Sequence, residues 1–293
     1  MTIKHSLVAA SAAVALALGS TLVAGAETML QIETRTIGGY EVAYTDQGTG
    51  EVLVLIHVLG ADLSRWREVV GPLSKSHRVI ALDLLGFGRS AKPDISYRGQ
   101  TYVDQLFALL DALDIENATL TGNSMGGWIA LLAAEQKPNR IERLVLAAPA
   151  FVQGLPDGMS AEMLATGAAP QSENDMRAYL GRVYASPPTD GATVRQLLHE
   201  HRTANANGAI EAISRSLAAG EDAFTPERLA QLHQPVLIIH GDRDGIVPMV
   251  ASEALVDLLP SAQLLQIKNV SHWPQVEAPD DFLNAISETP ETM

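Results

Sequence analysis

Short apolar runs alternate with longer amphipathic stretches along most of this chain, and this alternation restricts the possible fold more than any other feature. The apolar runs are rich in Val, Ile and Leu and lie at 52–56, 78–82, 118–120, 144–147, 236–239 and 264–267. Such runs are typical of strands buried on both faces. Leu and Ala recur at three- and four-residue spacing in 102–113, 125–136 and 251–259, which predicts helices. Strand then helix, repeated, predicts an α/β fold with a mostly parallel, doubly wound sheet.

Two segments depart from this rhythm. Residues 34–37 and 41–45 flank Gly38 and Gly39, which predicts an antiparallel hairpin. Residues 151–232 are rich in Gly, Pro, Met and Ala, with helical periodicity and no intervening apolar strand pattern. We therefore expect a helical cap at 151–232, inserted into an α/β core formed by 27–150 and 233–293.

The first 26 residues have the pattern of a secretory signal peptide. Lys4 and His5 precede an apolar run at 7–18, and the small residues Ala24, Gly25 and Ala26 follow. A basic start, a short apolar region and a small-x-small cleavage site define such a signal. The alternative is an uncleaved anchor or tail, although the run is short for a membrane span. The sequence predicts cleavage after Ala26 and a periplasmic or secreted protein, without stable membrane insertion once the signal is removed.

The amino-acid composition argues against several classes of function. The chain has 293 residues and no cysteine, which excludes disulfides, thiol nucleophiles and thiolate metal sites. Its 34 acidic and 20 basic residues give a formal charge of −14, which repels nucleic acid at long range. The sequence contains no H-E-x-x-H, phosphate-loop or dinucleotide motif, so we expect no metal and no organic cofactor.

The string Gly122-Asn123-Ser124-Met125-Gly126 matches the G-x-S-x-G pattern. It directly follows a predicted strand and opens a predicted helix, which is the context that this motif requires for a nucleophilic serine. A sharp strand-to-helix turn lifts the serine hydroxyl above the sheet. The alternative is a Gly-rich turn in which the serine only caps the helix.

A serine hydroxyl needs a base within hydrogen-bond reach and a third group that orients the base. His272 follows the last predicted strand and is the candidate base. Asp244 follows the strand at 236–239 and is the preferred acid, with Asp242 as the alternative. Loops at the carboxyl ends of parallel strands are where such a sheet builds its site. The candidate triad is therefore Ser124, Asp244 and His272.

These motifs together make the chain resemble the α/β-hydrolase family over nearly its whole length after residue 26. Residues 83–90 are similar to that family's D-x-x-G-x-G-x-S turn, 241–248 to its G-x-x-D-x-x-x-P acid loop, and 272–279 to its H-x-x-x-x-E-x-P ending. The resemblance implies an α/β-hydrolase fold and a Ser-Asp-His triad. Residues 122–127, together with His272, Trp273, Gln275 and Glu277, also resemble the carbon-carbon bond hydrolases of meta-cleavage pathways, although many esterases and lipases carry similar strings.

The resemblance also implies an oxyanion hole formed by the backbone N–H groups of Met125 and Leu59. The family usually has His-Gly-x after its first core strand, whereas this chain has His57-Val58-Leu59-Gly60. A β-branched valine tolerates positive φ badly. We therefore expect a loop shifted from the family pattern, with His57 in a structural role.

Three functions remain open from the sequence. The first is an exported serine hydrolase that cleaves small or medium carboxylic esters. The second is a carbon-carbon bond hydrolase, in which one of the cap arginines Arg177, Arg182, Arg195 and Arg202 would bind an anionic group; solvated helix faces explain these arginines equally well. The third is a non-catalytic binding protein with the same fold, for which Val58 is the only support. The oligomeric state and the natural substrate are not predicted.

Overall fold

A computed structural model describes residues 30–154, 160–205 and 208–288 of the chain. Its centre is an eight-stranded sheet in the order β1-β2-β4-β3-β5-β6-β7-β8. The strands are β1 (Glu33–Ile37), β2 (Tyr40–Gln47), β3 (Val52–Ile56), β4 (Arg78–Leu82), β5 (Ala118–Asn123), β6 (Ile141–Ala147), β7 (Val236–Gly241) and β8 (Ala262–Ile267). The predicted signal peptide at 1–26 lies outside the described residues.

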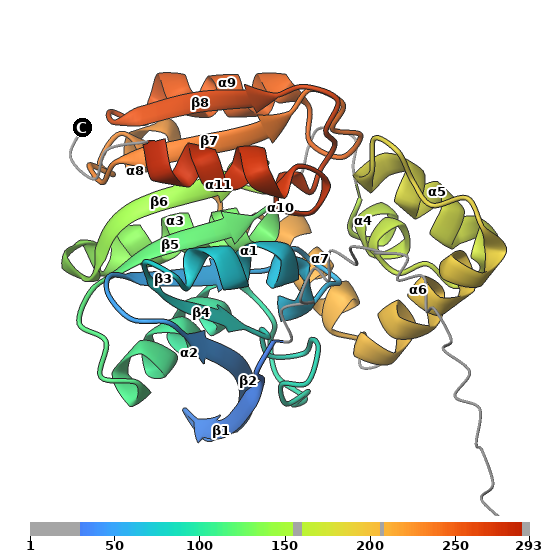
Figure 1. The fold of residues 1–293 in the computed structure, drawn as a ribbon, viewed down its shortest axis with the longest axis horizontal. Coiled ribbons are helices and arrows are strands. Elements are labelled where there is room, and N and C mark those ends of the chain that lie inside the picture. Colours follow the sequence, from blue (N-terminus) through green and yellow to red (C-terminus); the bar gives the residue numbers. More distant parts are fainter. Residues whose placement is uncertain (1–29, 155–159, 206–207, 289–293) are drawn as a thin grey trace, which may run out of the picture.

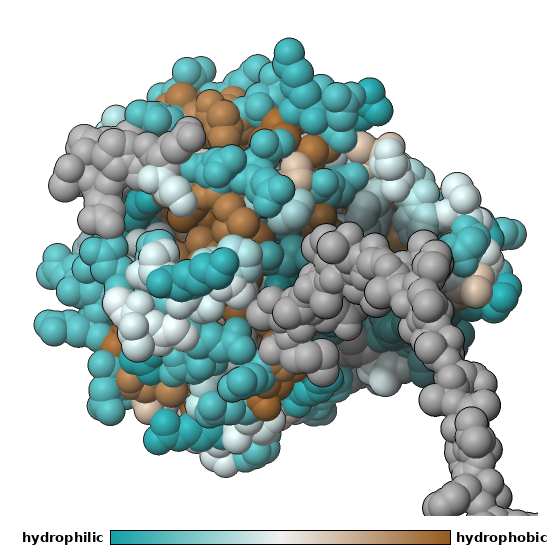
Figure 2. Space-filling view, viewed as in Figure 1, coloured by the Kyte–Doolittle hydropathy of each residue, from teal (hydrophilic) through white to brown (hydrophobic). Residues whose placement is uncertain are grey.

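The predicted sheet is confirmed in its main features. The pair β1–β2 is the expected antiparallel hairpin, and β2–β4 is also antiparallel. The remaining neighbouring pairs, β4–β3, β3–β5, β5–β6, β6–β7 and β7–β8, are all parallel. The sequence predicts that every apolar strand is buried on both faces. This prediction is wrong for β8, which lies at the edge of the sheet and whose Leu265 is 39% exposed. Figure 2 shows apolar residues at the surface over this β7–β8 edge.

Alternate strand residues pack against different helices. In β3, Val54 and Ile56 join a core with α2 (Gly99–Ala112), α3 (Met125–Gln136) and α9 (Met249–Leu258). Leu53 and Leu55 point to the other face and pack with α1 (Arg67–Leu73) and α11 (Pro279–Glu288). Successive side chains of a strand point to opposite faces, so an apolar run without alternation needs both layers. The two layers of helices are visible in Figure 1.

The described residues between β6 and β7 form the helices α4 (Ala161–Ala168), α5 (Glu173–Val183), α6 (Gly191–Ala204), α7 (Ala209–Ala218) and α8 (Pro226–Leu229). In Figure 1, α4 to α7 lie together beyond the carboxyl ends of the parallel strands, and we call these four helices the cap. Helix α8 lies instead against the core, where Arg228 pairs with Glu135 of α3. The insertion at 151–232 thus contains a helix that is bonded directly to the core, and its division into domains stays a prediction.

The short elements complete the description: the 3-10 helices η1 (Leu63–Trp66) and η2 (Pro138–Arg140), and helix α10 (Pro274–Glu277). Over the described part of the chain, helices long and apolar enough to cross a membrane are absent.

Candidate active site

Ser124 occupies the turn between β5 and α3 in a conformation that non-glycine residues rarely adopt, with φ 55° and ψ −114°. Two glycines make this turn possible. A Cβ atom at Gly122 would lie 2.2 Å from the Gly126 carbonyl oxygen, and one at Gly126 would lie 2.2 Å from the Ile56 carbonyl oxygen. The G-x-S-x-G spacing is therefore required by backbone contact, and the turn holds the serine at the carboxyl end of β5.

The predicted acid and base form a direct pair. His272 Nδ1 lies 2.8 Å from Asp244 Oδ2, and both side chains are buried. The other carboxylate oxygen, Asp244 Oδ1, accepts the backbone N–H groups of Ile246 at 2.7 Å and Val247 at 2.9 Å. Gly241 allows the acid and base loops to touch, since a Cβ atom there would lie 2.3 Å from the Ser271 carbonyl oxygen.

The electrostatics of Asp244 suit an ionised orienting group. Burial alone would raise its pKa, but the interactions with His272 and His240 and the bond from Val247 N–H together hold the pKa of Asp244 well below its usual range. His240 Nε2 lies 3.4 Å from Asp244 Oδ2 and 3.0 Å from the Val247 carbonyl oxygen, and His240 Nδ1 lies 2.7 Å from Ser252 Oγ. His240 therefore packs behind the acid as a structural support.

Asp242, the alternative acid, has a different position. Its side chain is exposed, and Oδ1 accepts the backbone N–H of Asn269 at 2.6 Å. Arg243 also reaches Asn269, at 2.6 Å. Asp242 is a turn residue at the surface, and the geometry pairs Asp244 rather than Asp242 with His272.

Asn123 connects the serine turn to the base loop. Its amide nitrogen donates to the Ala147 carbonyl at 2.9 Å and to the His272 carbonyl at 3.1 Å, while its amide oxygen accepts from Gln275 Nε2 at 3.2 Å. All of this network is buried. The residue before the serine thus holds the main chain of the histidine.

The remaining ring nitrogen of the base is available for proton transfer. His272 Nε2 is buried, and within the described residues it has no hydrogen-bond partner, Ser124 Oγ included. Because Asp244 accepts the Nδ1 proton, Nε2 is the nitrogen that can take a proton from a serine. Catalytic hydrogen bonds in proteins without substrate are often long and tighten only in the complex.

The oxyanion loop differs from the expectation based on Val58. Residues 58–61 form a turn in which the Ala61 N–H donates to the Val58 carbonyl at 3.2 Å, and the positive φ of 74° belongs to Gly60. This is the position of a type II turn that needs glycine. Val58 is not among the described residues with positive φ, so the expected conflict does not arise.

The two predicted donors, Leu59 and Met125, lie on segments that touch. Met125 is the first residue of α3, so its N–H has no acceptor within the helix. The Leu59 N–H is not used by the 58–61 turn, whose hydrogen bond comes from Ala61. The close approach of Gly126 to the Ile56 and His57 carbonyls brings the start of α3 against this loop. The arrangement can direct two backbone donors toward a carbonyl oxygen above Ser124.

His57 contacts the start of the same loop and the Leu84 backbone. It is fully buried, its Nε2 accepts the Leu84 N–H at 3.0 Å, and its Nδ1 lies 2.8 Å from the Val58 carbonyl oxygen. Burial lowers the pKa of His57 to about 4, so the ring is neutral at pH 7. The structural role expected for His57 is consistent with these contacts.

The cap packs against the loops beside the candidate catalytic residues, which are themselves buried. Ser124 is 2% and His272 1% exposed. Tyr179, Leu180 and Val183 of α5 pack with Trp273 and with Val58 in one apolar cluster, so the cap meets both the base loop and the oxyanion loop.

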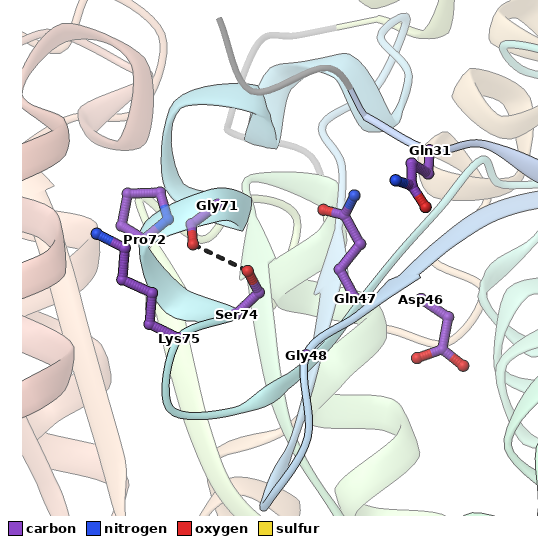
Figure 3. A pocket seen from close by; sticks show the side chains of 8 residues that line it. All are labelled: Gln31, Asp46, Gln47, Gly48, Gly71, Pro72, Ser74 and Lys75. Carbon is purple, nitrogen blue, oxygen red and sulfur yellow. Dashed lines mark hydrogen bonds between the residues drawn. The ribbon is translucent and has the colours of Figure 1, made fainter. Parts of the chain in front are cut away.

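Two hollows on the surface lie away from these residues. One of about 530 Å³ is lined by residues shown in Figure 3: Gln31, Asp46, Gln47, Gly48, Gly71, Pro72, Ser74 and Lys75. It lies near the amino ends of β3 and β4, since Asp46 pairs with Arg78, the first residue of β4. A second, of about 780 Å³, lies on the cap around Arg195 and Arg202. Neither hollow contains a predicted catalytic residue.

Clusters of three or more His, Asp or Glu side chains that could hold a metal ion are absent from the described ranges.

Comparison with known proteins agrees with this arrangement. The family profile of the alpha/beta hydrolase fold matches residues 51–279. The chain belongs to the α/β-hydrolase family. It is 35% identical to a 2-hydroxymuconate semialdehyde hydrolase of Pseudomonas sp. strain CF600 over 258 residues, which cover 83% of this chain and 88% of the relative.

Solved structures of two kinds resemble this hydrolase. The meta-cleavage product hydrolase of Pseudomonas fluorescens IP01 is 30% identical, with a TM-score of 0.74 over 87% of this chain and 96% of that one. A bacterial membrane phospholipase A is 27% identical, with a TM-score of 0.77 over 88% of this chain and 84% of that one. The fold and the hydrolase class are therefore shared with enzymes that have different substrates.

Several residues of the site have contacts that the sequence did not indicate. Asn123, Gln275 and Glu277 belong to strings that the family resemblance includes, but their hydrogen bonds could not be inferred from the motifs. Asn205 at the end of α6 donates to the Gly60 carbonyl at 2.9 Å, across 145 residues of chain. No motif contains Asn205, because the bond goes to a main-chain oxygen in a distant loop.

Proposed function

We propose that this hydrolase cleaves carboxylic esters, with Ser124 as the nucleophile. The observation that carries the proposal is the combination of a strained Ser124 at the carboxyl end of β5 with a buried His272–Asp244 pair, in which His272 Nε2 has no hydrogen-bond partner among the described residues. This is the set of groups that activates a serine hydroxyl.

The reaction proceeds in two steps. His272 Nε2 takes the hydroxyl proton as Ser124 Oγ attacks the ester carbonyl, and the oxyanion is stabilised by the N–H groups of Met125 and Leu59. Asp244 holds the imidazole in the required tautomer. The protonated His272 then gives its proton to the leaving alcohol, and a water activated by the same ring releases the acid and restores Ser124.

The cap arginines favour an ester over a ring-cleavage dienoate. Arg177, Arg182, Arg195 and Arg202 are all exposed. Arg177 donates to the Thr189 carbonyl and Arg182 to the Gly167 carbonyl, both within the cap. These four side chains therefore do not supply a buried cation for a substrate carboxylate. Similarity to a lipase of Moraxella, 28% identical over 87% of this chain, also fits ester cleavage.

A carbon-carbon bond hydrolase is the second candidate. The 35% identity to the semialdehyde hydrolase supports it. Arg65 also supports it. This half-buried cation has its guanidinium carbon 4.3 Å from the centre of the ring of Trp273, the residue that follows His272. The non-catalytic alternative loses its single argument, because the 58–61 turn places its positive φ at Gly60.

Two assays separate the candidates. We expect the enzyme to hydrolyse p-nitrophenyl esters of short and medium chain length, with turnover reduced about a millionfold in Ser124→Ala. A 2-hydroxy-6-oxo-dienoate from ring cleavage is assayed with the same preparations. Turnover of the dienoate alone would contradict the ester proposal and support the second candidate.

We also propose that the enzyme is exported. The support is the basic start at Lys4, the apolar run at 7–18 and the Ala24-Gly25-Ala26 site. Residues 1–26 contain one basic residue, Lys4, and no acidic residue. Their removal leaves 19 basic and 34 acidic residues, which give a formal charge of −15. N-terminal sequencing of the protein recovered outside the cytoplasm tests the cleavage after Ala26.

A further inference from the structure

The carboxyl end of cap helix α5 is bonded to both loops that carry the catalytic pair. We call residues 182–185 the α5 anchor. The Arg182 carbonyl accepts the Ser271 hydroxyl at 3.0 Å and the Gly245 N–H at 3.2 Å. Ser271 precedes His272, and Gly245 follows Asp244. One cap carbonyl therefore joins the base loop to the acid loop.

Glu277 makes a second, independent connection. Its Oε2 accepts the Ser271 N–H at 2.7 Å, and its Oε1 accepts the N–H of Ala185 at 2.7 Å. A carboxylate that accepts two backbone N–H groups forms short, charge-assisted bonds. The Glu277 side chain thus spans from the residue before the base to the α5 anchor.

The fit between the α5 anchor and the acid loop is tight. A Cβ atom at Gly245 would lie 2.8 Å from the Arg182 carbonyl oxygen and 3.1 Å from its Cα, and both of these are backbone atoms. Such an overlap forces a shift of one segment. Close approach to the cap therefore accounts for glycine at the position next to Asp244.

We propose that the α5 anchor is a positioning element for the catalytic pair, and that Glu277 and Ser271 are the positioning residues through which the docked cap fixes His272 relative to Ser124. This inference rests on the proposed function, because it takes His272 as the base. Glu277 and Ser271 act on the main chain that carries the ring, through the bonds to the Ser271 N–H and the Arg182 carbonyl. Misplacement of a catalytic group by about 1 Å costs about a hundredfold in rate.

The test compares Glu277→Gln and Ser271→Ala with the wild type. Glu277→Gln keeps the shape but turns an NH₂ group toward one of the two N–H donors, so one bond is lost. Ser271→Ala removes only the bond to the Arg182 carbonyl. Glu253→Gln, on the exposed side of α9, makes the same charge change away from the site and is the control.

We expect kcat on a p-nitrophenyl ester to fall about ten- to a hundredfold in Glu277→Gln and about tenfold in Ser271→Ala, with KM changed by less than about threefold. The rate of fluorophosphonate reaction at Ser124 falls in parallel. The effects of the two changes are less than additive in the double variant, because both act on one loop. Circular dichroism confirms that each variant is folded at the assay temperature.

The outcomes distinguish this inference from the function on which it rests. If the wild type reacts at Ser124 and both folded variants keep kcat and labelling rate within twofold, the α5 anchor has no positioning role and the proposed function stands. Lower melting temperatures with unchanged kcat per folded molecule also contradict it, because they indicate a structural role alone. A folded wild type that does not react at all overturns the proposed function first. If Glu277→Gln does not fold, Ser271→Ala carries the comparison.

Discussion

The core and the cap hold the loops of the candidate site in different ways. In the core, the backbone approaches so closely at Gly122, Gly126 and Gly241 that a Cβ atom there would overlap other backbone atoms. These turns therefore need glycine. The cap is joined to the loops of the site mainly by hydrogen bonds, which involve Arg182 of the α5 anchor, Ala185 through Glu277, and Asn205 just after α6; Gly245 also packs against the Arg182 backbone. The first kind of contact leaves a fixed residue pattern in the sequence, and the second leaves almost none.

This difference divides the site into a chemical part and a positioning part. The core supplies the groups of the proposed reaction: Ser124 as nucleophile, His272 as base, Asp244 as the carboxylate that orients the base, and the backbone N–H donors. The cap supplies contacts that set their spacing. Changes in the core should therefore alter catalysis most, whereas changes in the cap should act through position and stability.

After the loss of Ser124 itself, the next largest effect is also expected in the core. Asp244→Asn keeps the shape of the acid but removes the charge that selects the His272 tautomer, so kcat should fall about ten-thousandfold. Steady-state kinetics on a p-nitrophenyl ester measure this. Asp242→Asn makes the same change two residues away at the surface and should leave kcat within about twofold. A larger loss in Asp242→Asn than in Asp244→Asn would reverse the assignment of the acid.

A smaller effect is expected from a buried histidine of the cap. His201 lies in α6, is 7% exposed, and its Nε2 lies 2.8 Å from the Ala168 carbonyl oxygen. Burial lowers the pKa of His201 to about 4, and the charge of Arg65 acts in the same direction, while the Ala168 bond and Asp62 oppose it. The folded cap therefore keeps this ring neutral, whereas the unfolded chain protonates it near pH 6.5.

The sign of the pH dependence follows from this difference. Between pH 6.5 and 4 the unfolded state binds a proton that the folded state does not, so the contribution of His201 to the free energy of unfolding falls as the pH falls through that window. The full difference is about 3 kcal/mol. Urea unfolding at pH 7 and pH 4.5 should show a weaker pH dependence in His201→Gln than in the wild type. His199→Gln, at an exposed position of the same helix, is the control. Equal pH dependence in all three proteins would contradict a buried, neutral His201.

Most of the fold could be predicted from the sequence because buried strands leave unbroken apolar runs. Runs such as 52–56 and 78–82 coincide with β3 and β4, and the predicted helix at 125–136 coincides with α3. The error at β8 has a physical reason: an edge strand needs apolar residues on only part of its surface, yet residues 264–267 give the same local pattern as a central strand.

The site was predictable where chemistry demands a particular side chain at a particular turn. Ser124, Asp244 and His272 are of this kind, and the structure places the last two in direct contact. Val58 was misjudged because the sequence does not show which residue of the loop takes positive φ; the structure assigns it to Gly60. The contacts of Arg182 and Ala185 could not be predicted from the sequence, because they use backbone carbonyl and N–H groups that nearly every residue has.

We infer that His272 and Asp244 activate Ser124 in this hydrolase. The most direct measurement is the reaction of the folded protein with a fluorophosphonate, followed by intact and peptide mass spectrometry. We expect one adduct, on Ser124, that is absent from Ser124→Ala and nearly abolished in His272→Ala. An adduct on another residue, or an unchanged rate in folded His272→Ala, would contradict it.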